Sequence, residues 1–294
     1  MKKGRFLWAL LFLAVIVTAV LFYFRADWRF LLKDTVAGWF QERKELVLVD
    51  SSSLIRQEKS LSALLSEGAC TYNQSMMLVN SAYQLDDGLT AAVSEYKDTG
   101  VLMNDCIMDA YADLAADIND RFGEKLYVMS SYRSEEEQAD ISAREDANTA
   151  AEVGSSEHQT GLALDVYVKY YAGDGFLKSE AGQYVNANCQ DYGFIIRYPR
   201  GKEHITGIRF EPWHIRYVGA PHAAYMASND LTLEEYIDSL EPGKFYQLDA
   251  YLVSRQRGTT FSIPSDYTEL TVSPDNTGYY ILTFRLDGVS AKNK

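Results

Sequence analysis

Two stretches, SSEHQTGLALDV at residues 155–166 and EPWHIRYVG at residues 211–219, determine how the middle of this chain folds. The second half of the first stretch alternates apolar residues with others, and so does HIRYV in the second. Such a period of two is expected of a β-strand with one buried face. The alternation places Asp165 on the face opposite the leucines. We therefore expect two short strands that each present polar side chains on one face.

A turn must separate His158 from Asp165 if their side chains are to meet. On a straight strand the two residues would lie roughly 23 Å apart, at about 3.3 Å per residue. Gly161 lies between them and has the conformational freedom that a tight turn needs. In the second stretch Pro212 interrupts the strand ladder, so that the residues on its two sides are expected to reach one cavity.

His158, Asp165, Glu211 and His214 together supply the groups of a catalytic zinc site. Two imidazoles and one carboxylate form a three-ligand set with a position left for water, and a glutamate beside them can transfer protons. A single histidine on a strand, or a single aspartate near glycine, is more often structural. However, the chain has only four histidines, and two of them lie in these stretches. The combination predicts a zinc-dependent hydrolase.

Arg133 lies at a predicted junction between a strand over residues 126–129 and a helix over residues 134–147. A serine and a glutamate three residues apart form the capping box that begins this helix. The free backbone N–H groups and the dipole of a helix start favour an anion, so Arg133 is suited to bind a carboxylate. Gln138 can donate to the same anion from its amide. The alternative for Arg133 is a surface ion pair with a neighbouring glutamate.

The remaining patterns predict a mixture of helices and strands. Residues 105–122 carry apolar residues on one helical face, and Gly123 ends that helix. A capped helix is predicted over residues 232–240. Three or four strands follow, and the clearest of them are at residues 245–254, 259–263 and 279–286. We expect an α+β fold with a small antiparallel sheet, helices packed on one side of it, and a small β-rich appendage at the C-terminal end.

The N-terminal region contains an apolar series over residues 6–24, with no charged residue. This length is sufficient to cross a hydrocarbon core of about 30 Å. Lys2, Lys3 and Arg5 precede it, which would keep the N-terminus in the cytoplasm and the rest of the chain outside. No small-x-small cleavage site follows, so we expect an uncleaved transmembrane anchor rather than a signal peptide.

These patterns divide the chain into four expected parts. Residues 1–34 form a cytoplasmic tip and transmembrane anchor, residues 35–69 a juxtamembrane stalk, and residues 70–225 the zinc-binding domain. Residues 226–294 form a helix and the small β-rich appendage, whose function the sequence does not indicate. The net charge of −13 disfavours nucleic acid as a partner. The oligomeric state is not indicated.

Several residues with potential chemistry are expected to be structural. Cys70, Cys106 and Cys189 have no metal-ligand spacing, and an odd number of cysteines does not imply a disulfide framework, although a single disulfide stays open. For Cys106 and Cys189, which lie among apolar residues in predicted helices, a role as small buried hydrophobic residues is the simpler interpretation. His204 lies in a charged loop and His222 follows a proline, and neither belongs to a recognisable site.

The chain resembles the VanY-type zinc D-alanyl-D-alanine carboxypeptidases, a group with closely similar L,D-carboxypeptidases and D,D-dipeptidases of bacterial cell walls. The resemblance covers residues 70–225, through SSYRSEEEQ, SSEHQTGLALDV, YGFIIRYPRGKEHITG and EPWHIRYVG. It implies the zinc D,D-peptidase fold, which is also hedgehog-like. By this resemblance Zn²⁺ is bound by His158, Asp165 and His214, and Glu211 is the catalytic base. The residues that it implies for substrate binding are Arg133, Gln138, Ser156 and Tyr198.

The resemblance implies removal of the terminal D-alanine from peptidoglycan stem pentapeptides or from their lipid-linked precursor, outside the cell membrane. An L,D-carboxypeptidase that acts on tetrapeptide stems would use the same residues. A zinc-containing module that binds or senses the cell wall is the alternative from another functional class. The sequence does not separate D,D from L,D preference, nor a role in glycopeptide resistance from wall remodelling.

Overall fold

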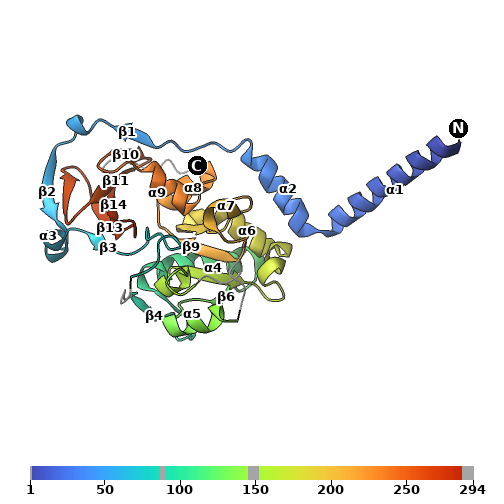
Figure 1. Cartoon of the computed structure of the whole chain (residues 1–294), viewed down its shortest axis with the longest axis horizontal. Coiled ribbons are helices and arrows are strands. Elements are labelled where there is room, and N and C mark those ends of the chain that lie inside the picture. Colours follow the sequence, from blue (N-terminus) through green and yellow to red (C-terminus); the bar gives the residue numbers. More distant parts are fainter. Residues whose placement is uncertain (1, 87–90, 145–151, 287–294) are drawn as a thin grey trace.

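A four-stranded antiparallel sheet in the order β6-β7-β9-β8 lies at the centre of the part of the chain that holds the two sequence stretches (Figure 1). The computed structural model describes residues 2–86, 91–144 and 152–286. Asp165 on β7 pairs directly with His214 on β9, which brings the two sequence stretches together. The strands are β6 (Tyr127–Ser130), β7 (Ala163–Tyr167), β8 (Phe194–Ile196) and β9 (His214–Tyr217).

Helices α4 (Met108–Phe122) and α6 (Glu180–Asn188) cover the apolar side of this sheet. Helix α4 ends at Gly123 as predicted, and the φ of 64° at this residue lies in the left-handed region that favours glycine. Asp165 points to the other side of the sheet because side chains alternate along a strand. Helix and sheet share one hydrophobic cluster that includes Leu114, Ile118, Leu164, Val166, Cys189 and Ile215.

Helix α5 (Glu135–Ser142) follows β6 and begins with the predicted capping box. The Ser134 hydroxyl accepts a hydrogen bond from the Glu137 N–H, and the Glu137 carboxylate accepts one from the Ser134 N–H. The prediction extended this helix to residue 147, whereas the helix ends at Ser142; residues 145–147 lie outside the described part. The loop between β6 and α5 holds Arg133 next to the polar side of the sheet.

A second, six-stranded sheet has the order β1-β10-β11-β14-β13-β3 and combines both ends of the chain. The prediction of a small, separate C-terminal appendage therefore needs correction, because the C-terminal strands pair with β1 and β3, which come from residues near the N-terminus. A further pair joins β12 to β2. The strands are β1 (Val47–Val49), β2 (Arg56–Ser60), β3 (Thr71–Tyr72), β10 (Phe245–Leu248), β11 (Tyr251–Arg257), β12 (Thr260–Pro264), β13 (Glu269–Pro274) and β14 (Tyr279–Arg285).

Two further predictions about the C-terminal strands need correction. The single strand expected over residues 245–254 is two strands, because Asp249 turns the chain with a φ of 52°. Strand β13 was not among the segments predicted. The predicted helix after residue 232 is α9, which Thr232 caps through a second capping box. The other elements are α3 (Leu61–Ser66), α7 (Glu203–Thr206), α8 (His222–Asn229), α9 (Leu233–Ser239), β4 (Val93–Glu95) and β5 (Leu102–Asn104).

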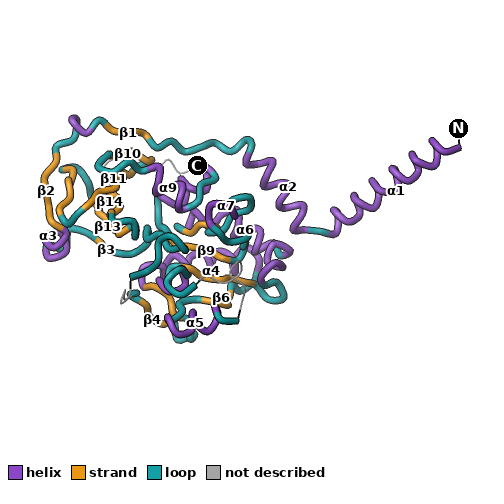
Figure 2. Tube along the Cα trace, in the orientation of Figure 1, coloured by secondary structure: helices purple, strands orange, loops and turns teal. Residues whose placement is uncertain are grey.

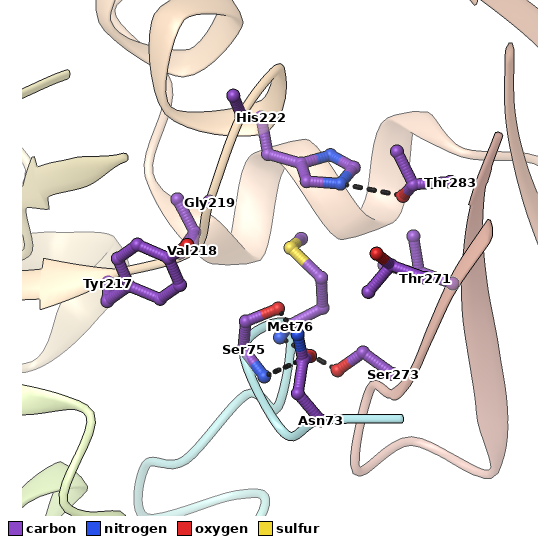
Figure 3. A pocket seen from close by; sticks show the side chains of 12 residues that line it. Asn73, Ser75, Met76, Tyr217, Val218, Gly219, His222, Thr271, Ser273 and Thr283 are labelled. Carbon is purple, nitrogen blue, oxygen red and sulfur yellow. Dashed lines mark hydrogen bonds between the residues drawn. The ribbon is translucent and has the colours of Figure 1, made fainter. Parts of the chain in front are cut away.

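A small polar cavity of about 70 Å³ lies between the two sheets (Figure 3). His222 is buried beside it and forms hydrogen bonds with the Tyr236 hydroxyl at 2.7 Å and the Thr283 hydroxyl at 2.9 Å. Burial lowers the pKa of His222 to about 3, so this imidazole is neutral at physiological pH. It is a structural residue, as expected. The three cysteines are free thiols, so the disulfide left open by the sequence is not formed.

Helix α1 (Lys2–Phe24) extends away from the body that the other elements form, and helix α2 (Ala26–Gly38) lies against that body (Figures 1 and 2). The Gln183 amide donates to the carbonyl of Ala26, and Arg200 donates to the hydroxyl of Thr35. Within the described residues, no helix alone meets the length and apolarity needed to cross a membrane. Two consecutive helical segments, Leu11–Phe24 and Ala26–Gly38, meet these criteria only when they are taken together, and the chain bends by 93° between them.

Candidate active site

A tight turn brings His158 back over strand β7, as the spacing predicted. His158 lies in the 3₁₀ turn Glu157–Thr160, and Gly161 ends this turn with a φ of 68°. A Cβ atom at Gly161 would lie 2.7 Å from Val93 Cγ1 and 2.8 Å from the backbone nitrogen of Asn104. Any larger residue would therefore displace the turn that positions His158.

His158, Asp165 and His214 converge on one point. Their ligand atoms all lie within 4.8 Å of one another. The distance from Asp165 Oδ2 to His158 Nε2 is 3.4 Å, and the distance from Asp165 Oδ1 to His214 Nδ1 is 3.0 Å. The Nδ1 of His158 lies 2.9 Å from the carbonyl oxygen of Ser131, which leaves Nε2 facing the cluster. Three donor atoms from two strands and a turn thus surround one position.

The cluster fits a zinc ion. Asp165 Oδ1 is buried and lacks a hydrogen-bond partner among the described residues, which is costly unless a cation binds there. Burial opposes ionisation of Asp165, but His158 and His214 hold its pKa well below the usual range, so the carboxylate is charged. Two neutral imidazoles and a carboxylate form a common ligand set of catalytic zinc. His158, Asp165 and His214 are therefore the candidate zinc ligands.

Glu211 lies beside this cluster, and its carboxyl group is mostly buried. Its Oε2 is 3.9 Å from Nδ1 of His214. Burial raises the pKa of Glu211 above the usual range of a glutamate. The backbone before Pro212 is fixed, because the N–H of Glu211 donates to the carbonyl of Tyr198 at 3.1 Å. A buried carboxyl group with a raised pKa next to the metal position is suited to transfer protons near neutral pH.

A cavity of about 310 Å³ opens over the metal position. Seven of the eight site residues that the sequence predicted line it. The ring of Tyr198 packs on the ring of His214, with centroids 4.7 Å apart. The cavity is lined by Met129, Ser130, Arg133, Ile141, Ser156, His158, Asp165, Tyr198, Ile208, Arg209, Glu211, Trp213 and His214.

The eighth predicted residue, Gln138, is fully buried behind Arg133 rather than in the cavity wall. Its Oε1 accepts a hydrogen bond from Arg133 Nη1 at 2.8 Å, and Ser130 Oγ accepts one from Arg133 Nη2 at 2.8 Å. Gln138 therefore holds the guanidinium in place through its Oε1, and the expectation that its amide donates to an anion stays a prediction. Arg133 is the residue of this pair that faces the cavity.

A group of buried charges behind the candidate zinc ligands was not predicted from the sequence. Glu157 is the residue before His158, and its Oε1 accepts hydrogen bonds from Arg197 Nε and Arg216 Nη1, each at 2.7 Å. Arg197 and Arg216 have no exposed surface, and Glu157 is 1% exposed. The one signal in the sequence is that Arg216 occupies an otherwise apolar strand two residues after His214, and that Glu157 directly precedes His158.

Comparison with known proteins finds a matching family and a similar sequence. The family model of VanY, D-alanyl-D-alanine carboxypeptidase, matches residues 100–220. A D-alanyl-D-alanine carboxypeptidase of Enterococcus faecium is 31% identical over 234 residues, which are 74% of this chain and 74% of that protein.

The solved structures that are similar to this chain include the following two. The vancomycin-resistance D,D-dipeptidase VanXYg, in complex with a D-Ala-D-Ala phosphinate analogue, has a TM-score of 0.62 and 26% identity, over 79% of this chain and 99% of its own. The LD-carboxypeptidase LdcB has a TM-score of 0.51 and 33% identity, over 56% of this chain and 86% of its own.

Proposed function

Because the chain belongs to the VanY family of zinc D-alanyl-D-alanine carboxypeptidases, we propose that it removes the terminal D-alanine from peptidoglycan stem or lipid-linked precursor pentapeptides. The observation that carries this proposal is that one cavity contains both the zinc cluster and Arg133. An enzyme that cuts only the last peptide bond needs a cation to bind the free carboxylate and a hydrolytic centre beside it.

In the proposed reaction Arg133 binds the terminal carboxylate, and Gln138 and Ser130 hold the guanidinium in place. Ser156 and Tyr198 form the wall beside the last residue of the substrate. A zinc ion at the cluster would supply Lewis-acid activation of water and of the scissile carbonyl group.

Glu211 accepts the proton of the attacking water and then donates it to the amine of the departing D-alanine. This dual role requires a carboxyl group that is not itself a zinc ligand, and Glu211 lies outside the His158, Asp165 and His214 cluster. It also benefits from a raised pKa, which the burial of Glu211 provides. One D-alanine is released in each cycle together with the carboxylate that Arg133 recognised, and the shortened peptide ends in a new carboxylate formed from the scissile carbonyl group.

The D,D preference is proposed because VanXYg, which is similar over most of this chain, was solved with a D-Ala-D-Ala analogue. The likeness to LdcB makes L,D-carboxypeptidase activity the second candidate.

Mass spectrometry of the zinc-loaded protein with a pentapeptide stem and a tetrapeptide stem in parallel distinguishes the D,D from the L,D activity. We expect loss of one alanine from the pentapeptide. Preferential cleavage of the tetrapeptide would establish the L,D activity instead, and cleavage of neither would contradict both.

We also propose that helix α1 anchors the protein in the cell membrane with the active site outside. The apolar series over residues 6–24 and the basic residues before it support this proposal. Helix α2 adds support, because Trp28, Leu32 and Val36 are exposed at four-residue spacing on the side not packed against the catalytic body. Such an apolar stripe on a helix bent by 93° from α1 suits a position along the lipid surface.

Charges in the middle of α1 test the anchor. We expect the full chain to stay with bacterial membranes after an alkaline carbonate wash, and the Val15→Arg/Val17→Arg variant to be released, since each arginine at a helix centre costs about 2.5–3.5 kcal/mol on insertion. Val47→Arg, at an exposed valine of β1, is the matched control and should remain bound. Release of the unaltered protein by the wash would contradict the anchor.

A further inference from the structure

Two buried polar atoms face each other behind the zinc cluster. Glu157 Oε2 and His214 Nε2 are 3.8 Å apart, and neither has a hydrogen-bond partner among the described residues. Glu157 is 1% exposed and His214 is 4% exposed, so solvent contributes little to either group. A buried donor and a buried acceptor without partners each cost free energy, unless they pair with each other.

The Glu157 carboxylate cannot turn away from His214. Its other oxygen, Oε1, accepts two hydrogen bonds from Arg197 and Arg216. Arg197 is also held by Glu234, at 2.9 and 2.6 Å, and Arg216 donates to the carbonyl oxygens of Ser75 and Met77. The positive charges of the two arginines are balanced by the negative charges of Glu157 and Glu234. The network therefore fixes one carboxylate oxygen and directs the other at the imidazole.

The two histidine ligands present different nitrogens to the metal position. Nδ1 of His158 faces the carbonyl of Ser131, so Nε2 faces the cluster. His214 is reversed, because its Nδ1 lies 3.0 Å from Asp165 Oδ1 and its Nε2 faces Glu157. A neutral imidazole can bind a metal only through the nitrogen without a proton, so each histidine needs a partner that fixes its tautomer.

We propose that Glu157 is the positioning residue of His214, whose Nε2–H donates to Glu157 Oε2 so that the deprotonated Nδ1 faces the zinc. Shifts of less than about 1 Å bring the pair to hydrogen-bond distance. This inference rests on the zinc site of the proposed function and deepens it. The Arg197–Arg216 pair acts through Glu157, because it keeps the carboxylate charged and stationary.

The Glu157→Gln variant of the full chain in detergent tests the role of the carboxylate. Both arginines require an acceptor, so the glutamine oxygen should face them and its NH₂ should face His214. That NH₂ would donate to Nε2 and favour the tautomer with the proton on Nδ1, where zinc must bind. We expect a loss of zinc affinity of about 10- to 100-fold, measured by competition with a chelator.

Glu234→Gln is the matched control, because it weakens the same arginine network without facing His214. We expect its zinc affinity to stay within about twofold of the unaltered protein, and its thermal unfolding to report the general cost of damaging the network. Equal losses of affinity in the two variants, or no loss in Glu157→Gln, would overturn the inference and leave Glu157 with a purely structural role.

NMR of the unaltered, zinc-loaded chain labelled with ¹⁵N-histidine gives an answer that does not depend on how a variant folds. We expect His214 to carry its proton on Nε2, and a proton on Nδ1 would overturn the inference. Neither measurement uses peptide hydrolysis. Zinc binding with the expected tautomer but without D-alanine release would therefore refute the proposed function and retain the role of Glu157.

Discussion

Replacing Glu211 with glutamine is expected to lower kcat for D-alanine release by about 10³-fold while zinc remains bound. Glutamine keeps the size of the side chain but cannot accept the proton of the attacking water. Glu211 lies outside the His158, Asp165 and His214 cluster, so its substitution leaves all three ligands in place. Steady-state kinetics on a pentapeptide stem, together with the zinc content of the purified variant, measure both parts of this prediction.

The control is Glu203→Gln, at an exposed glutamate in α7 that does not line the active-site cavity. It should retain the full kcat. If Glu211→Gln kept more than about one-tenth of the kcat, another group would have to serve as the base. A protein that used zinc only to bind or sense the cell wall would be indifferent to both changes, so the same experiment distinguishes an enzyme from a binding module.

The parts of the active site that the sequence predicts are those that local patterns encode. The alternation in LALDV places Asp165 on the side of β7 away from the core, and Gly161 permits the turn that returns His158 to it. The capping box at Ser134 locates the start of α5, and hence Arg133, without any knowledge of the rest of the fold. Each of these inferences spans fewer than about ten residues, over which backbone preferences dominate.

The parts that the sequence does not predict depend on contacts between distant residues. Strands β1 and β3 complete a sheet whose other members lie about two hundred residues later, and strand periodicity does not specify a partner. The charged network has the same origin, because Glu157 lies 40 and 59 residues from the two arginines that hold it. The missed turn at Asp249 is local, but it needs an aspartate in the left-handed region, which few aspartates adopt.

Replacing Arg133 with alanine is expected to lower kcat/KM on a pentapeptide stem by about 10²- to 10³-fold, since removal of one partner of a desolvated charge pair costs about 2–5 kcal/mol. Arg133→Lys should recover part of this loss because lysine keeps the charge but lacks the forked guanidinium. Arg144→Ala is the matched control, because Arg144 is an exposed arginine near the end of α5 that pairs only with Asp140 in the described structure. Its kinetics should be unchanged.

A peptide whose C-terminal carboxylate is converted to an amide shows whether Arg133 acts through that group. For the unaltered protein, kcat/KM should fall on the amidated peptide by about as much as Arg133→Ala lowers it on the peptide with a free carboxylate. For Arg133→Ala, amidation of the peptide should lower kcat/KM little further. Such non-additivity is the signature of two groups in direct contact. Fully additive losses would mean that Arg133 supports the fold of the β6–α5 loop through Ser130 and Gln138, and that another residue selects the peptide terminus.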